Sequence, residues 1–136
     1  MNSETINMLI EEAKKILPNS YAPYSNVHVA AALLTESGKI FHGVNVENAS
    51  YGLTICAERV AVASAVTAGE RRFKAIAIVS DTPEPLPPCG ACRQVLAEFA
   101  DEDMLIASHS IKSGKTATWR LGELLPYAFT QKHIEK

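Results

Sequence analysis

The segment from residue 56 to residue 68 is almost entirely apolar after its first turn, and a second apolar run follows it at 74–80. Gly69 closes the segment, as a glycine commonly does after the C-terminus of a helix. A helix with so little polar surface has to be buried on most of its sides. We therefore expect this helix to pack on a sheet inside a layered fold.

The other patterns predict strands and helices in alternation. They predict, in chain order, a helix at 6–17, strands at 27–35 and 40–46, a helix at 56–68, a strand at 74–80, a helix at 90–99, strands at 104–108 and 116–120, and a short helix at 121–125. Strand–helix–strand units predict parallel pairs, whereas the turn at 36–39 predicts an antiparallel opening hairpin. Residues 1–136 are thus expected to form a single α/β domain around a mixed sheet.

Charge and composition favour a small substrate. The chain carries 13 basic and 15 acidic side chains, a formal net charge of -2, without a long run of either sign. A protein that binds a nucleic acid polymer usually presents a basic stripe, which this sequence lacks. The N-terminal segment does not have the pattern of a signal peptide, and no segment approaches the roughly 20 apolar residues of a membrane span. We expect a cytoplasmic protein that binds neither a membrane nor a polynucleotide.

Three cysteines lie at the starts of two predicted helices. Cys56 opens the first helix, and Cys89 and Cys92 open the second. In a reducing compartment, an odd number of clustered thiols indicates metal binding or catalysis rather than a closed set of disulfides. Three protein ligands are typical of catalytic zinc, whereas structural zinc sites are normally closed by four. The sequence therefore predicts a catalytic Zn²⁺ site with one open position.

Glu58 and Arg59 follow Cys56 closely enough to take part in the chemistry of this site. Three thiolates leave the zinc centre with a net negative charge, which would make bound water a poorer acid. Arg59 and the positive ends of the two helices are predicted to offset this charge. Glu58 is predicted to accept a proton from the zinc-bound water and to deliver protons to the substrate and the leaving amine.

Several motifs make this sequence similar to the cytidine deaminase family. A Cys, one residue and a Glu, followed later by Pro-Cys-x-x-Cys, is the pattern of zinc deaminases. The motifs are Tyr-Ala-Pro-Tyr-Ser at 21–25, Gly-Val-Asn-Val-Glu-Asn-Ala at 43–49, Cys-Ala-Glu-Arg at 56–59, Pro-Cys-Gly-Ala-Cys-Arg-Gln at 88–94 and Glu-Leu-Leu-Pro at 123–126. A lone Cys-x-x-Cys would be weak evidence, but the resemblance extends from about residue 21 to residue 129.

The resemblance implies a fold and an activity. Members of the short form of this family are expected to have a three-layer α/β/α fold with a mixed five-stranded sheet, and they are usually homotetramers. The implied reaction is hydrolytic deamination of cytidine or 2'-deoxycytidine to uridine or 2'-deoxyuridine plus ammonia. It would proceed through zinc-bound hydroxide, without an organic cofactor, as part of pyrimidine salvage.

The resemblance also assigns roles to individual residues. Cys56, Cys89 and Cys92 match the zinc ligands, and Glu58 matches the catalytic acid/base. The positions that match substrate-binding residues are Asn45 and Glu47 for the ribose hydroxyls, the backbone N–H of Ala57 for the pyrimidine carbonyl, and Tyr51 and Phe129 for aromatic walls that neighbouring subunits can supply.

Val27 departs from the family pattern. Short cytidine deaminases similar to this chain usually carry Phe at this position, with the ring packed on the bound base. Val leaves more room, so we expect the pocket to tolerate N4-substituted cytidines at some cost to cytidine affinity. A deaminase of a blasticidin-type antibiotic is the alternative, although Asn45 and Glu47 favour ordinary nucleosides.

Two other classes of protein share part of this pattern. A polynucleotide-editing deaminase would use the same zinc motif but would need a basic surface for the strand. A non-catalytic, zinc-stabilised interaction module would need neither Glu58 nor an open coordination position. Without the family match, Asn45 and Glu47 could be polar edge residues, and Tyr51 and Phe129 could be packing aromatics.

Overall fold

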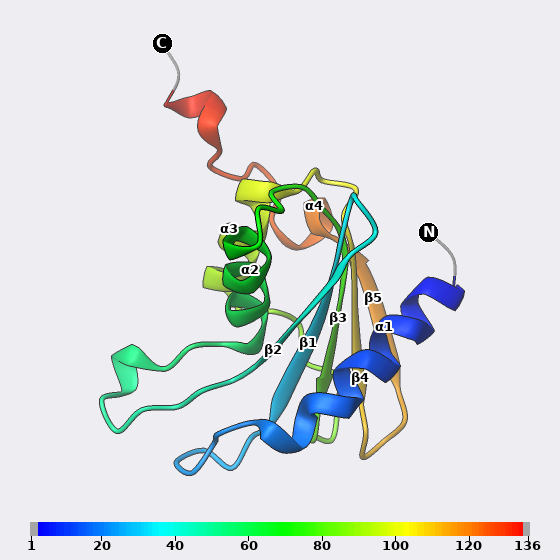
Figure 1. Ribbon diagram of the computed structural model, residues 1–136, viewed down its shortest axis with the longest axis vertical. Coiled ribbons are helices and arrows are strands. Elements are labelled where there is room, and N and C mark those ends of the chain that lie inside the picture. Colours follow the sequence, from blue (N-terminus) through cyan, green and yellow to red (C-terminus); the bar gives the residue numbers. More distant parts are fainter. Residues whose placement is uncertain (1–2, 135–136) are drawn as a thin grey trace.

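The computed structural model describes residues 3–134, which form one sheet with helices on both of its faces (Figure 1). The elements are, in chain order, α1 (Ser3–Ile16), η1 (Leu17–Asn19), β1 (Val29–Thr35), β2 (Ile40–Val44), η2 (Tyr51–Leu53), α2 (Ala57–Thr67), β3 (Phe73–Ser80), α3 (Gly90–Phe99), β4 (Leu105–Ser110), β5 (Thr116–Arg120), α4 (Leu121–Leu124) and η3 (Gln131–His133). The bounds of α3 and β5 are those that the sequence predicts.

The sheet has five strands in the order β2-β1-β3-β4-β5. β1 pairs antiparallel with β2 and with β3, β3 pairs parallel with β4, and β4 pairs antiparallel with β5. The mixed sheet and the antiparallel opening hairpin are confirmed. The prediction of parallel pairs is right for β3–α3–β4 and wrong for β2–α2–β3, because β1 lies between β2 and β3. Six of the seven residues of β1 are buried, which favours a position inside the sheet over one at its edge.

Alternation along the strands divides the core into two layers. Ala31 and Leu33 of β1 face α2, α3 and α4, whereas Ala30 and Ala32 face α1. Figure 1 shows α2 and α3 together on one face of the sheet and α1 on the other. The predicted three-layer α/β/α fold is confirmed.

β1 and β2 are shorter than predicted where they approach the cysteine-bearing helices. β1 begins two residues later, and β2 ends two residues earlier, than the predicted bounds. The backbone N–H of Val27 donates to Ser25 Oγ at 3.0 Å, and that of His28 donates to Asp81 Oδ1 at 2.9 Å. These two N–H groups thus bind side chains rather than carbonyls of a neighbouring strand, and the backbone before Val29 leaves the sheet.

α2 ends as predicted but is less buried than predicted. Gly69 has a φ of +91°, and the next residue, Glu70, donates its N–H to the carbonyl of Ala65 at 2.9 Å, as in a Schellman cap. Only the side that faces the sheet is buried, and Ala63 on the opposite side is exposed. No helix among residues 3–134, α2 included, is long and apolar enough to cross a membrane.

Candidate metal centre and active site

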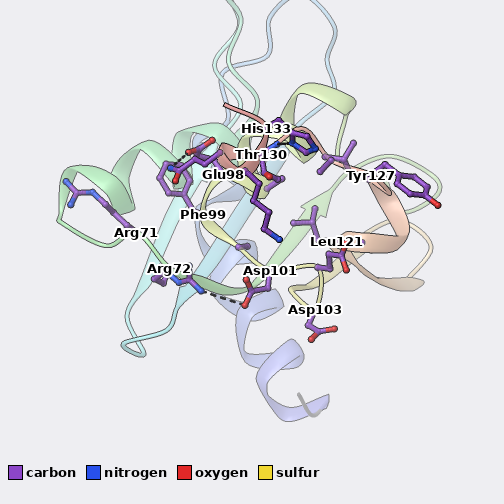
Figure 2. A pocket seen from close by; sticks show the side chains of 18 residues that line it. Arg71, Arg72, Glu98, Phe99, Asp101, Asp103, Leu121, Tyr127, Thr130 and His133 are labelled. Atoms are coloured by element: carbon purple, nitrogen blue, oxygen red, sulfur yellow. Dashed lines mark hydrogen bonds and ion pairs between the residues drawn. The ribbon is translucent and has the colours of Figure 1, made fainter. Parts of the chain in front are cut away.

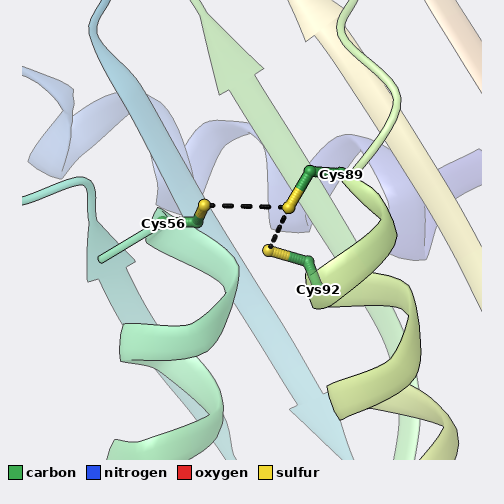
Figure 3. Close-up of side chains that lie close together, drawn as sticks. All are labelled: Cys56, Cys89 and Cys92. Atoms are coloured by element: carbon green, nitrogen blue, oxygen red, sulfur yellow. Dashed lines mark hydrogen bonds between the residues drawn. The ribbon is translucent and has the colours of Figure 1, made fainter. Parts of the chain in front are cut away.

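Three sulfurs meet where α2 and α3 begin (Figure 3). Cys56 is the N-cap residue of α2, Cys89 is the N-cap residue of α3, and Cys92 lies in the first turn of α3. Cys56 Sγ lies 3.9 Å from Cys89 Sγ, and Cys89 Sγ lies 3.3 Å from Cys92 Sγ. All three sulfurs lie within 4.8 Å of one another.

This arrangement fits a zinc ion. Two sulfurs bound tetrahedrally to one Zn²⁺ at about 2.3 Å lie about 3.8 Å apart, close to the separation of Cys56 and Cys89. Among residues 3–134, these cysteines form the only group of three or more potential metal ligands within such reach, so no fourth protein ligand joins them. Cys92 is buried whereas Cys89 is exposed, which leaves the centre open on one side.

The environment of Cys56 stabilises a thiolate. A hydrogen bond from the thiol of Cys92 and, next, the guanidinium of Arg59 lower the pKa of Cys56 to about 5, although its partial burial opposes the shift. Arg59 Nη2 lies 3.7 Å from Cys56 Sγ and 3.5 Å from the carbonyl oxygen of Thr54. Arg59 therefore lies where it can offset the charge of the Cys56 thiolate.

Glu58 lies in the first turn of α2, and only 6% of it is exposed. Burial raises the pKa of this carboxyl above its ordinary value, and the charge of nearby Cys56 adds to the rise. The raised pKa favours the protonated form of this carboxyl more than in an ordinary glutamate. Its place beside the sulfurs fits the role of a proton shuttle.

Gly43 of β2 sets how closely α2 packs on the sheet. A Cβ atom at this position would lie 2.3 Å from the carbonyl oxygen of Ala57 and 2.5 Å from the backbone nitrogen of Ala61. Any larger residue would push the first turn of α2, and with it Glu58, away from β2. Gly43 is the first residue of the motif at 43–49, and a glycine inside a strand can mark such a close approach, but its contact with α2 is defined only by the folded chain.

Asn45 binds the backbone on both sides of His28. Its Oδ1 accepts hydrogen bonds from Ser20 Oγ and from the backbone N–H of Val29, the latter at 3.0 Å, and its Nδ2 donates to the carbonyl of Val27 at 2.8 Å. The side chain that the resemblance assigns to ribose therefore also fixes the backbone of residue 27.

Glu47 holds the loop at residues 21–25. Its carboxylate accepts hydrogen bonds from the backbone N–H groups of Tyr24, at 2.9 Å, and of Ser25, at 3.1 Å, and from Ser25 Oγ. The bond with the Ser25 hydroxyl is the main reason why the pKa of Glu47 is lowered. Val46, between Asn45 and Glu47, pairs with Ile55, so this segment runs beside the residues that lead to Cys56.

The other predicted substrate-binding residues differ in their surroundings. Ala57 is fully buried, and its N–H is at the start of α2, where helical N–H groups have no intrahelical acceptor. Tyr51 is 74% exposed and its ring contacts Tyr24, with 5.9 Å between centroids. Phe129 is 59% exposed and stacks on His133 at 5.4 Å. Neither aromatic ring has a contact with the cysteines among those described.

A hollow of about 920 Å³ lies away from the cysteines, between the C-terminal end of α3 and the segment that follows α4 (Figure 2). Its walls include charged side chains of both signs, such as Arg72, Lys132 and Asp101. None of the three cysteines, nor Glu58, is among its lining residues. This hollow is therefore not part of the metal centre.

The metal centre defines a broad class of protein. Three convergent cysteines fit the three-ligand coordination that is typical of catalytic zinc. The buried carboxyl of Glu58, two residues from Cys56, is a group that can accept and donate the protons of a water molecule. On a three-layer α/β/α fold, this combination defines a zinc-dependent hydrolase.

Comparison with known proteins narrows the class to one family. Residues 3–108 match the cytidine and deoxycytidylate deaminase zinc-binding region. The cytidine deaminase of Sporosarcina psychrophila is 46% identical over 129 residues, which cover 95% of this chain and 94% of that protein. The cytidine deaminase of Halalkalibacterium halodurans is 49% identical over 127 residues, which cover 93% and 96%. The crystal structure of cytidine deaminase from Burkholderia pseudomallei matches with a TM-score of 0.85 at 48% identity, over 95% of this chain and 100% of that chain.

The chain therefore belongs to the cytidine and deoxycytidylate deaminase family, and it is a zinc-dependent enzyme of this family. The blasticidin-S deaminase of Bacillus cereus is also similar, at 30% identity over 137 residues, 95% of this chain and 87% of that protein. This identity is well below the 46% and 49% of the two cytidine deaminases. The comparisons thus favour the cytidine deaminases over the antibiotic deaminase.

Replacing Gly43 by Ala should disturb the metal centre by displacing the first turn of α2. We expect the free energy of unfolding to fall by about 1–3 kcal/mol, as for other overpacked cores. Zinc content after dialysis should also fall. Gly52→Ala is the matched control, because a Cβ atom at Gly52 meets nothing within 4 Å. Equal stability and zinc content in the two variants, measured by chemical denaturation and metal analysis, would contradict this role of Gly43.

Proposed function

We propose that this enzyme hydrolyses cytidine and 2'-deoxycytidine to uridine and 2'-deoxyuridine, with release of ammonia. The proposal rests on three thiol sulfurs that lie within 4.8 Å of one another beside a buried carboxyl, that of Glu58. Both bacterial relatives at 46% and 49% identity are named cytidine deaminases. The net charge of -2 supports a small nucleoside rather than a polynucleotide as the substrate.

Glu58 moves the protons of this reaction. When bound, zinc supplies the Lewis acidity that makes water a nucleophile near neutral pH. Glu58 takes a proton from the water that attacks C4 of the cytosine ring and passes it to ring N3. It then takes the proton of the new C4 hydroxyl and gives it to the 4-amino group, which leaves as ammonia. Because burial raises the pKa of Glu58, its carboxyl can hold a proton between these steps.

Asn45 and Glu47 are the residues proposed to bind the ribose. The segment that carries them pairs with Ile55, next to Cys56, so a nucleoside with its base at the metal centre can extend toward it. The described bonds of Asn45 Nδ2 use one of its two N–H groups, and carboxylate oxygens accept several hydrogen bonds. Both side chains therefore retain capacity for sugar hydroxyls while they hold the surrounding loops.

We also propose that the active enzyme is a homotetramer in which neighbouring chains supply Tyr51 and Phe129. An apolar groove of about 570 Å³ follows the outer side of α2 and is lined by Phe41, Ile55, Arg59, Val60, Ala63, Ser64 and Thr67. Leu53 and Tyr51 lie two and four residues before Ile55 of this groove in the sequence, and they are 65% and 74% exposed. Exposed apolar surface of this kind is typical of contacts between chains, and a second copy would bury α2 as the sequence predicts.

The chemistry of the site also indicates its cellular setting. Thiolates that hold a catalytic metal must stay reduced, which favours the cytoplasm. The proposed reaction returns cytosine nucleosides to uracil nucleosides and so would serve pyrimidine salvage.

Replacing Glu58 by Gln should abolish turnover while zinc stays bound. Gln has nearly the same shape but cannot accept and return a proton, so we expect kcat for cytidine to fall by about 10²–10⁴-fold. The decrease in absorbance on deamination measures turnover, and metal analysis measures zinc. Glu36→Gln is the control, because it makes the same change at an exposed position in the turn between β1 and β2. Turnover near the wild-type rate in a Glu58→Gln variant would refute the proposed role.

Replacing Val27 by Phe should improve the use of cytidine and impair the use of N4-substituted cytidines. An aromatic ring would pack on the base, for a gain in kcat/KM of roughly 2- to 10-fold, and would fill the space that a substituent needs. The test compares kcat/KM for cytidine and N4-methylcytidine in both proteins. If wild-type enzyme turns over no substituted cytidine, the proposed breadth of specificity is wrong.

A charge in the groove along α2 should dissociate the proposed tetramer. Ala63 is exposed in the single chain, so Ala63→Glu should leave the fold intact but prevent two apolar surfaces from meeting. Light scattering after size exclusion should give four chains for the wild type and fewer for this variant. Thr118→Glu, on the exposed edge strand β5, is the control. A monomeric and fully active wild type would contradict the proposal.

A further inference from the structure

The loop that leads to Cys89 contains few backbone donors. Proline occupies four of the six positions from 83 to 88, and proline has no backbone N–H. The start of the loop is held at Thr82, whose carbonyl accepts a hydrogen bond from Ser110 Oγ at 2.6 Å and whose Oγ1 donates to the carbonyl of Glu84 at 2.7 Å. The other end of the loop, next to the metal ligand, needs an anchor of its own.

Arg93 provides this anchor from the first turn of α3. Its Nε donates a 2.7 Å hydrogen bond to the carbonyl of Pro88, and its Nη1 donates a 2.9 Å hydrogen bond to the carbonyl of Leu124. Pro88 is fully buried and the hydrogen bond is partly buried, so this contact is partly shielded from water. Because a guanidinium presents its donors in a rigid plane, the two carbonyls are held in a fixed relation to each other.

The carbonyl of Pro88 belongs to the same peptide unit as the nitrogen of Cys89. A peptide unit is planar, so a bond that fixes the direction of its oxygen also fixes the plane from which Cys89 begins α3. Cys89 Sγ lies 3.9 Å from Cys56 Sγ and 3.3 Å from Cys92 Sγ, and the three sulfurs form a triangle (Figure 3). A rotation of this peptide plane would therefore move the sulfur of Cys89 relative to the other two.

The same turn of α3 also holds the C-terminal segment. Leu124 ends α4, and its carbonyl is one of the two acceptors of Arg93. The neighbouring side chain, Gln94, donates from Nε2 to the carbonyl of Phe129 at 2.8 Å. Arg93 thus joins the loop before Cys89 to the C-terminal segment. Gln94 donates to the C-terminal segment and not to that loop.

We propose that Arg93 is a positioning residue for the zinc centre. By holding the carbonyl of Pro88, Arg93 orients Cys89 toward the other two sulfurs and slows the release of the metal. This inference rests on zinc binding by the three cysteines and not on the identity of the substrate, so an enzyme that proved inactive on cytidine would still test it.

The test uses Arg93→Lys, which keeps the charge but cannot present two donors in one plane. Zinc-loaded protein is mixed with a chromogenic chelator, and the rate of zinc transfer is measured well below the unfolding temperature. We expect transfer about 10-fold faster than from the wild type, as when other groups that orient metal ligands are removed. The absorption bands of the cobalt-loaded protein should shift as well, because the geometry of the Cys89 thiolate changes.

Gln94→Ala is the matched control, because it removes the adjacent bond to the C-terminal segment and leaves the carbonyl of Pro88 bound. It should leave both the zinc transfer rate and the cobalt spectrum as in the wild type. If Arg93→Lys does not fold, Arg93→Gln takes its place, since its amide can still donate to one carbonyl. The proposal is overturned if the Arg93 variant matches the wild type in both measurements, or if Gln94→Ala changes them equally.

Discussion

The contact between Gly43 of β2 and the first turn of α2 fixes the position of the part of the metal centre that α2 carries, namely Cys56 and Glu58. It holds Ala57 against the sheet, and Ala57 lies between Cys56 and Glu58 in the chain. The other part follows from the direction of the strands. β2 and β3 run the same way because each is antiparallel to β1. α2 follows β2 and α3 follows β3, so both helices start beyond the C-terminal ends of these two strands. Their N-terminal cysteines can therefore meet at that end of the sheet.

Much of this fold could be predicted from local patterns. The apolar periodicity of α3 and the alternation in β5 are visible in the sequence, and the observed bounds of both elements match the predicted ones. The order of the strands could not be predicted in full. Nothing in the apolar run of β1 states that it pairs on both edges, and that pairing separates β2 from β3. The start of β1 could not be predicted either. The backbone N–H of His28 binds the side chain of Asp81, which is distant in the sequence, instead of a neighbouring strand.

The site shows the same division between local and distant information. The spacing of the cysteines and Glu58 is visible in the sequence, because each lies at the start of a helix. The double use of Asn45 and Glu47 is not visible, since their partners at residues 20–29 are defined only by the folded chain. In the sequence, Arg93 cannot be distinguished from an ordinary polar residue at the start of a helix. Its role depends on the carbonyls of Pro88 and Leu124, which only the folded chain brings together. The residues that bear the chemistry were therefore easier to predict than the residues that position them.

X-ray absorption at the zinc edge of the purified enzyme tests the central claim most directly. Three convergent cysteines with one open position predict three sulfur ligands at about 2.3 Å and one oxygen ligand at about 2.0–2.2 Å. Four sulfur ligands, or fewer than three with nitrogen in their place, would contradict a catalytic centre built from Cys56, Cys89 and Cys92.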